Sequence, residues 1–224
     1  GNVAKGGMGC SADGGAMNAL SAAMTISDSS FTGNQAIAGV APPVPGLGGA
    51  NAFGGALSIS TLSLTPTVLA TMTVKGSLFT ANEAHGGNGP SGGMAVGGAI
   101  SAYLGTMSVS DSLLSDNRAI GGGGQGPVGV GGAAVGGAIS CGSPYDLPSA
   151  QFSVRDSILV GNLAQGGAGG AGGNGGMAMG GGIANTATTL VVSGTTLMAN
   201  RAAGGAGGNG GVALGGGLFT GSAL

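Results

Sequence analysis

Apolar and polar residues alternate in several short stretches of the chain. Met72 and Val74 lie on one side of such a stretch, and Thr71 and Thr73 lie on the other. The same alternation recurs at residues 106–109 and 151–154. A period of two is typical of a β-strand with one buried face. The pattern therefore predicts short strands that direct apolar side chains to a core and mainly hydroxyl side chains to solvent.

A corner motif follows these stretches, in which a large hydrophobic residue precedes an asparagine by three positions. Its hydrophobic members are Phe31, Phe79, Leu114, Leu159 and Leu197, and its asparagines are Asn34, Asn82, Asn117, Asn162 and Asn200. Asn2 occupies the same frame, and successive asparagines are 32, 48, 35, 45 and 38 residues apart. Fixed motifs at unequal spacing indicate stacked coils with loops of different length, because helical repeats keep a tighter period and tolerate less glycine.

A second motif, Gly-Gly-small-aliphatic, occurs once in each repeat. Examples are Gly54-Gly55-Ala56-Leu57 and Gly97-Gly98-Ala99-Ile100. Stacked coils would pair equivalent strands in parallel at about 4.8 Å, so that like residues form ladders. Amide ladders stabilise stacked strands, and we expect the corner asparagines and the Phe/Leu positions to form two such buried ladders. The sequence thus predicts an all-β parallel solenoid of about five to six coils, with residues 1–224 as one domain.

Glycine-rich arms separate the two motifs. Residues 166–176 read Gly-Gly-Ala, Gly-Gly-Ala, Gly-Gly-Asn, Gly-Gly, and residues 204–211 follow the same scheme. A period of three matches polyproline II, in which each third residue would lie on one face. Flexible linkers are the alternative, because glycine-rich tracts are commonly disordered and glycine is costly to order. We expect ordered arms, since the triplet phase is kept and each arm leaves the same position of its coil.

Composition and charge narrow the class of protein. Glycine accounts for 56 of the 224 residues, without the strict Gly-X-Y period of collagen. The chain has 5 basic residues, scattered along its length, and a formal net charge of −2, so there is no basic stripe for nucleic acid. No uninterrupted run of eighteen apolar residues occurs, and we expect no membrane-spanning helix.

The paired motifs, Phe-x-x-Asn at Phe31 and Phe79 and Gly-Gly-Ala-Ile at residues 97–100, resemble the repeats of chlamydial-type polymorphic outer membrane proteins. More broadly they resemble the right-handed parallel β-helices of bacterial surface adhesins. This resemblance covers nearly the whole chain and implies a right-handed coil and an extracellular or cell-surface location. It also implies a stalk that adheres or self-associates. The long glycine arms and the lack of a β-barrel anchor depart from that family, and the arms resemble those of some phage tail adhesins and glycine-rich antifreeze bundles.

Few residues suggest catalysis. Asp28, Asp111 and Asp156 share one repeat position, where paired carboxylates could cleave a polysaccharide or bind calcium. An Asx turn is the simpler interpretation, because Gly76 and Gly194 replace the aspartate in other copies. His85 is the single histidine and has no partner motif. We therefore expect no enzymatic activity, no metal and no cofactor.

The two cysteines are predicted not to pair. Cys10 and Cys141 would lie about three coils apart, or about 14 Å at the strand spacing. A disulfide needs Cα atoms within about 7 Å. A bond from either cysteine to a neighbouring chain stays open at this point.

Two functions are consistent with the pattern. The first is a structural or adhesive module, either a segment of a longer chain or a protomer of a stacked filament, because no polar cap closes the solenoid at either end. Its expected partners are further copies, joined head to tail or laterally, and a glycan or cell-surface ligand. The alternative is an ice- or carbohydrate-binding solenoid that uses an outward hydroxyl ladder. That ladder would consist of Thr71, Thr73, Thr106 and Ser108, although an ordinary polar strand face also explains it.

Overall fold

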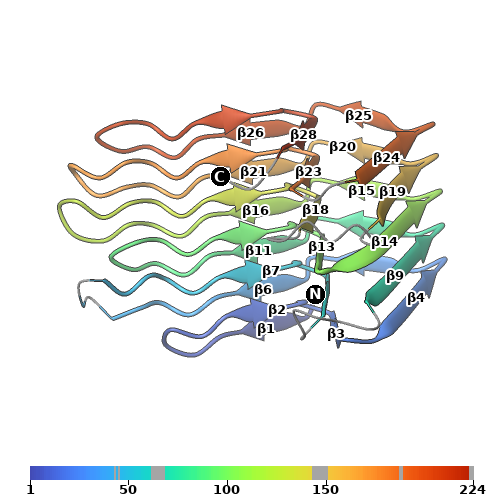
Figure 1. The fold of residues 1–224 in the computed structure, drawn as a ribbon, viewed down its shortest axis with the longest axis horizontal. Coiled ribbons are helices and arrows are strands. Elements are labelled where there is room, and N and C mark those ends of the chain that lie inside the picture. Colours follow the sequence, from blue (N-terminus) through green and yellow to red (C-terminus); the bar gives the residue numbers. More distant parts are fainter. Residues whose placement is uncertain (43, 45, 62–68, 143–150, 187–188, 222–224) are drawn as a thin grey trace.

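The chain winds into a stack of six coils whose strands pair in parallel (Figure 1). The computed structural model describes residues 1–42, 44, 46–61, 69–142, 151–186 and 189–221. Each of the first five coils contributes one strand to each of five sheets, which we name A to E in chain order, and the sixth coil contributes to sheets A, B and C. The prediction of an all-β parallel solenoid with five to six coils is confirmed.

Sheets A and B lie on either side of the arms in the chain. Sheet A consists of β1 (Val3–Lys5), β6 (Gln35–Ile37), β11 (Glu83–His85), β16 (Arg118–Ile120), β21 (Leu163–Gln165) and β26 (Arg201–Ala203). Sheet B consists of β2 (Ala12–Asp13), β7 (Ala52–Phe53), β12 (Ala95–Val96), β17 (Ala134–Val135), β22 (Ala178–Met179) and β27 (Ala213–Leu214).

Sheets C, D and E complete each coil. Sheet C consists of β3 (Met17–Leu20), β8 (Leu57–Ser60), β13 (Ile100–Tyr103), β18 (Ile139–Gly142), β23 (Ile183–Asn185) and β28 (Leu218–Thr220). Sheet D consists of β4 (Ala23–Ser27), β9 (Ala70–Lys75), β14 (Gly105–Ser110), β19 (Gln151–Arg155) and β24 (Thr189–Ser193). Sheet E consists of β5 (Ser30–Thr32), β10 (Leu78–Thr80), β15 (Leu113–Ser115), β20 (Ile158–Val160) and β25 (Thr196–Met198).

The main core lies inside sheets C, D and E. Alternate residues of each strand point inward, so that Met72 and Val74 of β9 are buried while Thr71 and Thr73 are exposed. Stacking in register turns these positions into columns, and Phe31 lies flat on Phe79 with ring centroids 4.9 Å apart. The Phe/Leu column continues through three leucines, in the order Leu114, Leu159 and Leu197. Burial of such columns is the main stabilising term of a solenoid.

Sheets A and B enclose a much thinner core, built almost entirely of alanine. Ala36, Ala84 and Ala119 of sheet A pack against Ala52 and Ala95 of sheet B. Small side chains let the two sheets approach closely, and the Gly-Gly motif brings them closer still. A Cβ on Gly98 would lie 2.6 Å from backbone atoms of Arg118. The second glycine of the motif is therefore required by backbone packing.

The first glycine of that motif is required by its backbone conformation. Gly97 has φ of 68°, and its counterparts Gly54 and Gly136 also lie in the left-handed region. The corner residue before the asparagine is left-handed as well, as in Ala81, with φ of 53°. A third left-handed position is the turn that holds Asp28, Asp111 and Asp156, or Gly76 and Gly194 in the other copies. Left-handed residues are rare except for Gly, Asn and Asp, which explains the composition of these turns.

The glycine arms project from one side of the stack and lie over one another (Figure 1). A continuous series of backbone hydrogen bonds runs through the arms. Its bonds alternately join the two halves of one arm and connect that arm to its neighbour. In its middle, Gly132 N–H donates to Gly122 C=O, Gly122 N–H to Gly93 C=O, and Gly93 N–H to Gly87 C=O, each at 2.8–2.9 Å. Residues such as Asn88 and Ala168, which follow a Gly-Gly pair, are exposed. The outgoing and returning halves of the stacked arms thus form two layers of backbone, and the paired glycines lie between these layers.

Candidate functional site

The corner asparagines form a continuous ladder along the stack. Asn82 Nδ2 donates to Asn117 Oδ1 at 2.9 Å, and Asn117 Nδ2 donates to Asn162 Oδ1 at 3.0 Å. Each oxygen also accepts the backbone N–H of the preceding asparagine, as Asn117 Oδ1 does from Asn82 at 3.0 Å. The second proton of the amide goes to a carbonyl of the preceding coil, such as Phe79 for Asn117. The side chains of Asn82, Asn117 and Asn162 are fully buried.

This ladder has a direction, because the side-chain oxygen of each asparagine from Asn34 to Asn200 accepts from the asparagine of the preceding coil. At the first coil, Asn2 N–H and Nδ2 donate to Asn34 Oδ1, and Asn2 Oδ1 accepts no bond from the described residues. At the last corner, Asn200 Oδ1 accepts from Asn162, while no described residue accepts the backbone N–H of Asn200. Within the described residues, the donors of each coil therefore match the acceptor of the next.

A second ladder, of hydroxyl groups, runs along the turn after sheet D. Ser77 N–H donates to Ser112 Oγ at 3.0 Å, and Ser112 N–H donates to Ser157 Oγ at 3.1 Å. Each hydroxyl in turn donates to a carbonyl two residues earlier, as Ser112 does to Ser110 at 2.7 Å. The sequence does not by itself predict this ladder, although a Ser or Thr follows each Asp or Gly of the turn.

The outer face of sheet D carries the predicted hydroxyl ladder. Thr71 pairs in register with Thr106, and Thr73 with Ser108. The two β9 threonines are exposed and their β14 partners are half-buried. Ser153 Oγ extends one column by donating to Ser108 Oγ at 3.2 Å, whereas Val191 ends that column. This face is hollowed, with a volume of about 450 Å³, and Arg155 also lines the hollow.

One outward column of sheet E is apolar by contrast, whereas the other includes Thr80 and Ser115. Leu78, Leu113 and Ile158 stack in register and are 37–46% exposed. Exposed aliphatic residues in one column offer a surface for lateral contact.

The remaining candidate residues are dispersed. The three turn aspartates have left-handed φ values of 47–52°, in the same region as Gly76 and Gly194 at this position of the other copies. Within the described part of the chain, no three His, Cys, Asp or Glu side chains gather where they could hold a metal ion. His85 Nδ1 lies 3.2 Å from the carbonyl of Gly86. Over the same residues, no helix is long and apolar enough to cross a membrane.

Both cysteines are free thiols, so the prediction that they do not pair with each other is confirmed. Cys141 is fully buried in the main core, and this burial raises the pKa of its thiol. A thiol held protonated in an apolar core is a poor nucleophile. Cys10 is exposed at the base of the first arm.

Comparison with known proteins gives no relative. No family model, no curated protein and no solved structure matches the chain. The resemblance to polymorphic outer membrane proteins therefore stays a prediction, and function has to be argued from the geometry alone.

Proposed function

We propose that this chain is a structural, self-associating module without catalytic activity, which extends by head-to-tail stacking of copies at a cell surface or outside the cell. The observation that carries the proposal is the directional, in-register asparagine ladder, which a further coil of another copy in the same register would continue. The extracellular location is supported by the motif resemblance to surface adhesins. Heterologous contacts of this kind do not close on themselves when the copies are related by translation along the stack, and they give filaments.

The free edges of sheet A have matching hydrogen-bond groups. Asn2 C=O accepts from Gln35 N–H in the second coil at 2.8 Å. A trans peptide unit points its C=O and N–H in opposite directions, so Val3 N–H faces away from the stack. At the other end, Arg201 N–H donates to Asn162 C=O, so Asn200 C=O faces outward. A second copy placed in the register of the interior coils would bring Val3 N–H onto Asn200 C=O.

Exposed core columns give the same contact an apolar component. Met17 of the first coil is 42% exposed, whereas Leu57 and Ile100 in the same column are fully buried. Leu218 in the sixth coil is half-buried. Sheets D and E have one strand fewer than sheets A to C, so the junction would pair three sheets directly.

Sedimentation velocity and electron microscopy over a range of protein concentrations test this proposal. We expect linear particles one solenoid wide, whose length grows with concentration. Val3→Pro removes the outward N–H, and an edge strand tolerates proline. We expect this variant to raise the dissociation constant of head-to-tail stacking about tenfold or more. Val3→Ala keeps the N–H and serves as the matched control. Particles that stay monomeric at all concentrations, or that assemble equally well with Val3→Pro, would contradict head-to-tail stacking.

A second candidate function is carbohydrate binding by the outer face of sheet D. The hollow there combines Thr71, Thr106 and Ser108 with the amide of Gln151 and the guanidinium of Arg155. Hydroxyl, amide and guanidinium groups are the polar partners that sugar hydroxyls need. A flat array would be expected for ice, so the hollow favours a glycan over ice.

A glycan array and a thermal hysteresis assay separate these ligands. We expect the double variant Thr71→Val/Thr106→Val to lose at least about tenfold in glycan affinity, since two hydrogen-bonding groups are removed. The matched control is Thr80→Val on the outer face of sheet E. Thermal hysteresis without glycan binding would favour ice as the ligand. If neither glycan binding nor thermal hysteresis is observed, this candidate function is ruled out.

A further inference from the structure

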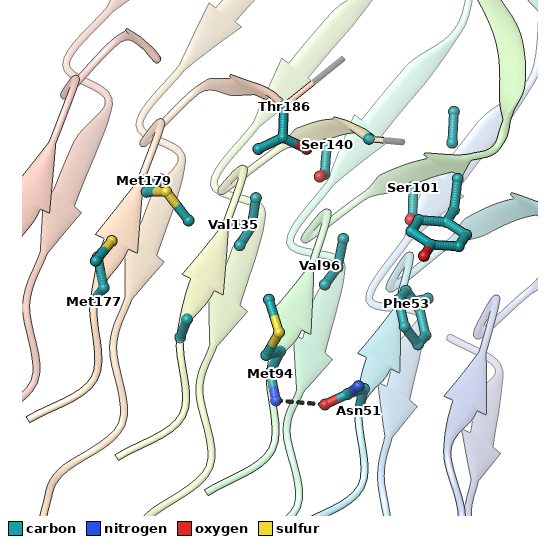
Figure 2. A pocket seen from close by; sticks show the side chains of 14 residues that line it. Asn51, Phe53, Met94, Val96, Ser101, Val135, Ser140, Met177, Met179 and Thr186 are labelled. Atoms are coloured by element: carbon teal, nitrogen blue, oxygen red, sulfur yellow. Dashed lines mark hydrogen bonds between the residues drawn. The ribbon is translucent and has the colours of Figure 1, made fainter. Parts of the chain in front are cut away.

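An apolar groove lies where the outer faces of sheets B and C meet, beside the base of the arms (Figure 2). Its volume is about 430 Å³, within the range of small-molecule sites. The groove is distinct from the asparagine ladder, the stack ends and the hollow on sheet D.

Two columns of residues form the long walls of the groove. Sheet B contributes Phe53, Val96, Val135 and Met179, which pair in this order from coil to coil. Sheet C contributes a hydroxyl column that includes Ser101 and Ser140. Four coils at the strand spacing give the groove a length of about 14 Å along the stack. An elongated occupant would therefore lie parallel to the stack.

The ends of the groove are lined by soft and aromatic side chains. Phe53 and Tyr103 lie at one end, with ring centroids 6.3 Å apart. Met177 and Met179 lie toward the other end (Figure 2). Methionine and aromatic side chains adapt to aliphatic and aromatic ligands. None of the described residues that line the groove is charged.

The hydroxyl of Ser101 is the feature that points to a ligand. Ser101 is 1% exposed, and its Oγ makes no hydrogen bond. The neighbouring serines of the column, Ser58 and Ser140, pair with Ser101 in register, but neither bonds to its Oγ. Buried polar atoms without a partner are rare and costly in native proteins, and a molecule with a hydroxyl or carbonyl group in the groove would satisfy this one.

We propose that the groove binds an uncharged, elongated aliphatic molecule whose single hydroxyl or carbonyl group bonds to Ser101. A carboxylate or phosphate would be buried without a cation, which is unfavourable. A sugar would leave most of its hydroxyls facing Val96, Val135 and the methionines. This binding does not depend on head-to-tail stacking or on the face of sheet D.

Displacement of 1,6-diphenylhexatriene by 1-decanol tests the site. The probe is an uncharged rod that fluoresces in apolar surroundings. The assay uses the full chain carrying Val3→Pro as well as the unmodified chain, so that uptake at a stacking contact is recognised. We expect probe uptake in both, displacement by 1-decanol, and at least tenfold weaker displacement by decanoate at pH 8.

Three variants locate the binding. Val135→Trp should abolish probe uptake by filling the groove, while Val191→Trp, on the outer face of sheet D, should not. If Val135→Trp does not fold, as judged by circular dichroism, Val96→Trp replaces it. Ser101→Ala should weaken 1-decanol binding about threefold to tenfold and change probe affinity less than twofold, because the probe has no polar group. The proposal is overturned if the chain takes up no probe, or if uptake is unchanged in Val135→Trp and Val96→Trp. It is also overturned if decanoate displaces the probe as well as 1-decanol does.

Discussion

Asn117→Ala is expected to lower the free energy of unfolding by about 3–4 kcal/mol, a large effect for one polar residue. Its amide makes four hydrogen bonds, two as acceptor from Asn82 and two as donor to Phe79 and Asn162. Removing it leaves the buried backbone N–H of Asn82 without a partner and opens a small cavity. Each buried group left unsatisfied costs about 1–3 kcal/mol.

Asn2→Ala is the matched control when both variants are made in the Val3→Pro chain, because it then removes the same chemistry from an exposed coil of the same ladder. Asn34 Oδ1 would still accept the backbone N–H of residue 2. We expect a loss below about 1 kcal/mol. Denaturant unfolding of both variants measures the difference between their free energies of unfolding. The comparison holds if the free energy depends on denaturant concentration with the same slope in both variants. If the two losses lie within about 1 kcal/mol of each other, the interior ladder does not stabilise the stack as the hydrogen bonds indicate.

The ladder positions could be predicted because the same residue type returns at the same point of each motif. Stacking in register follows from that repetition, and the Phe31–Phe79 contact is its direct consequence. The direction of the ladder could not be predicted, since it depends on which proton of each amide reaches the next coil. The hydroxyl ladder of Ser77 and Ser112 was visible as a recurrent Ser or Thr, but a turn alone also explains that pattern.

The groove and the contacts between the arms could not be predicted from the sequence, for different reasons. Strands of sheet B are two residues long, too short for alternation to show that Val96 and Val135 point outward. Their proximity to Ser101 depends on the angle at the left-handed Gly97. In the arms, the triplet phase favoured an ordered backbone, but glycine has no side chain whose pattern reveals which residues it contacts.

Gly49→Ala is expected to destabilise the chain by about 3 kcal/mol and to open the arms locally. A Cβ at this position would clash with Gly87 O and lie 2.7 Å from Gly93 N. Neither atom can move away without breaking the bond from Gly93 N–H to Gly87 C=O or the bond from Gly87 N–H to Ala50 C=O. Overpacking against backbone typically costs about 1–3 kcal/mol, and here two arms must shift together.

The neighbouring residue provides the control, since a Cβ on Gly48 would meet its nearest atom, Ser91 O, at 3.7 Å. Neither glycine has a left-handed φ, so backbone strain does not differ between the two variants. We expect Gly48→Ala to change the free energy of unfolding by less than about 1 kcal/mol. Alanine lowers the conformational entropy of the unfolded chain, and this effect favours a small gain in stability. Thermal unfolding gives both values, and amide hydrogen exchange at Gly87 and Gly93 reports on the arms themselves. Equal melting temperatures with fast exchange at both amides would mean that the arms are flexible linkers, because a disordered chain has no neighbour for the added methyl group to meet.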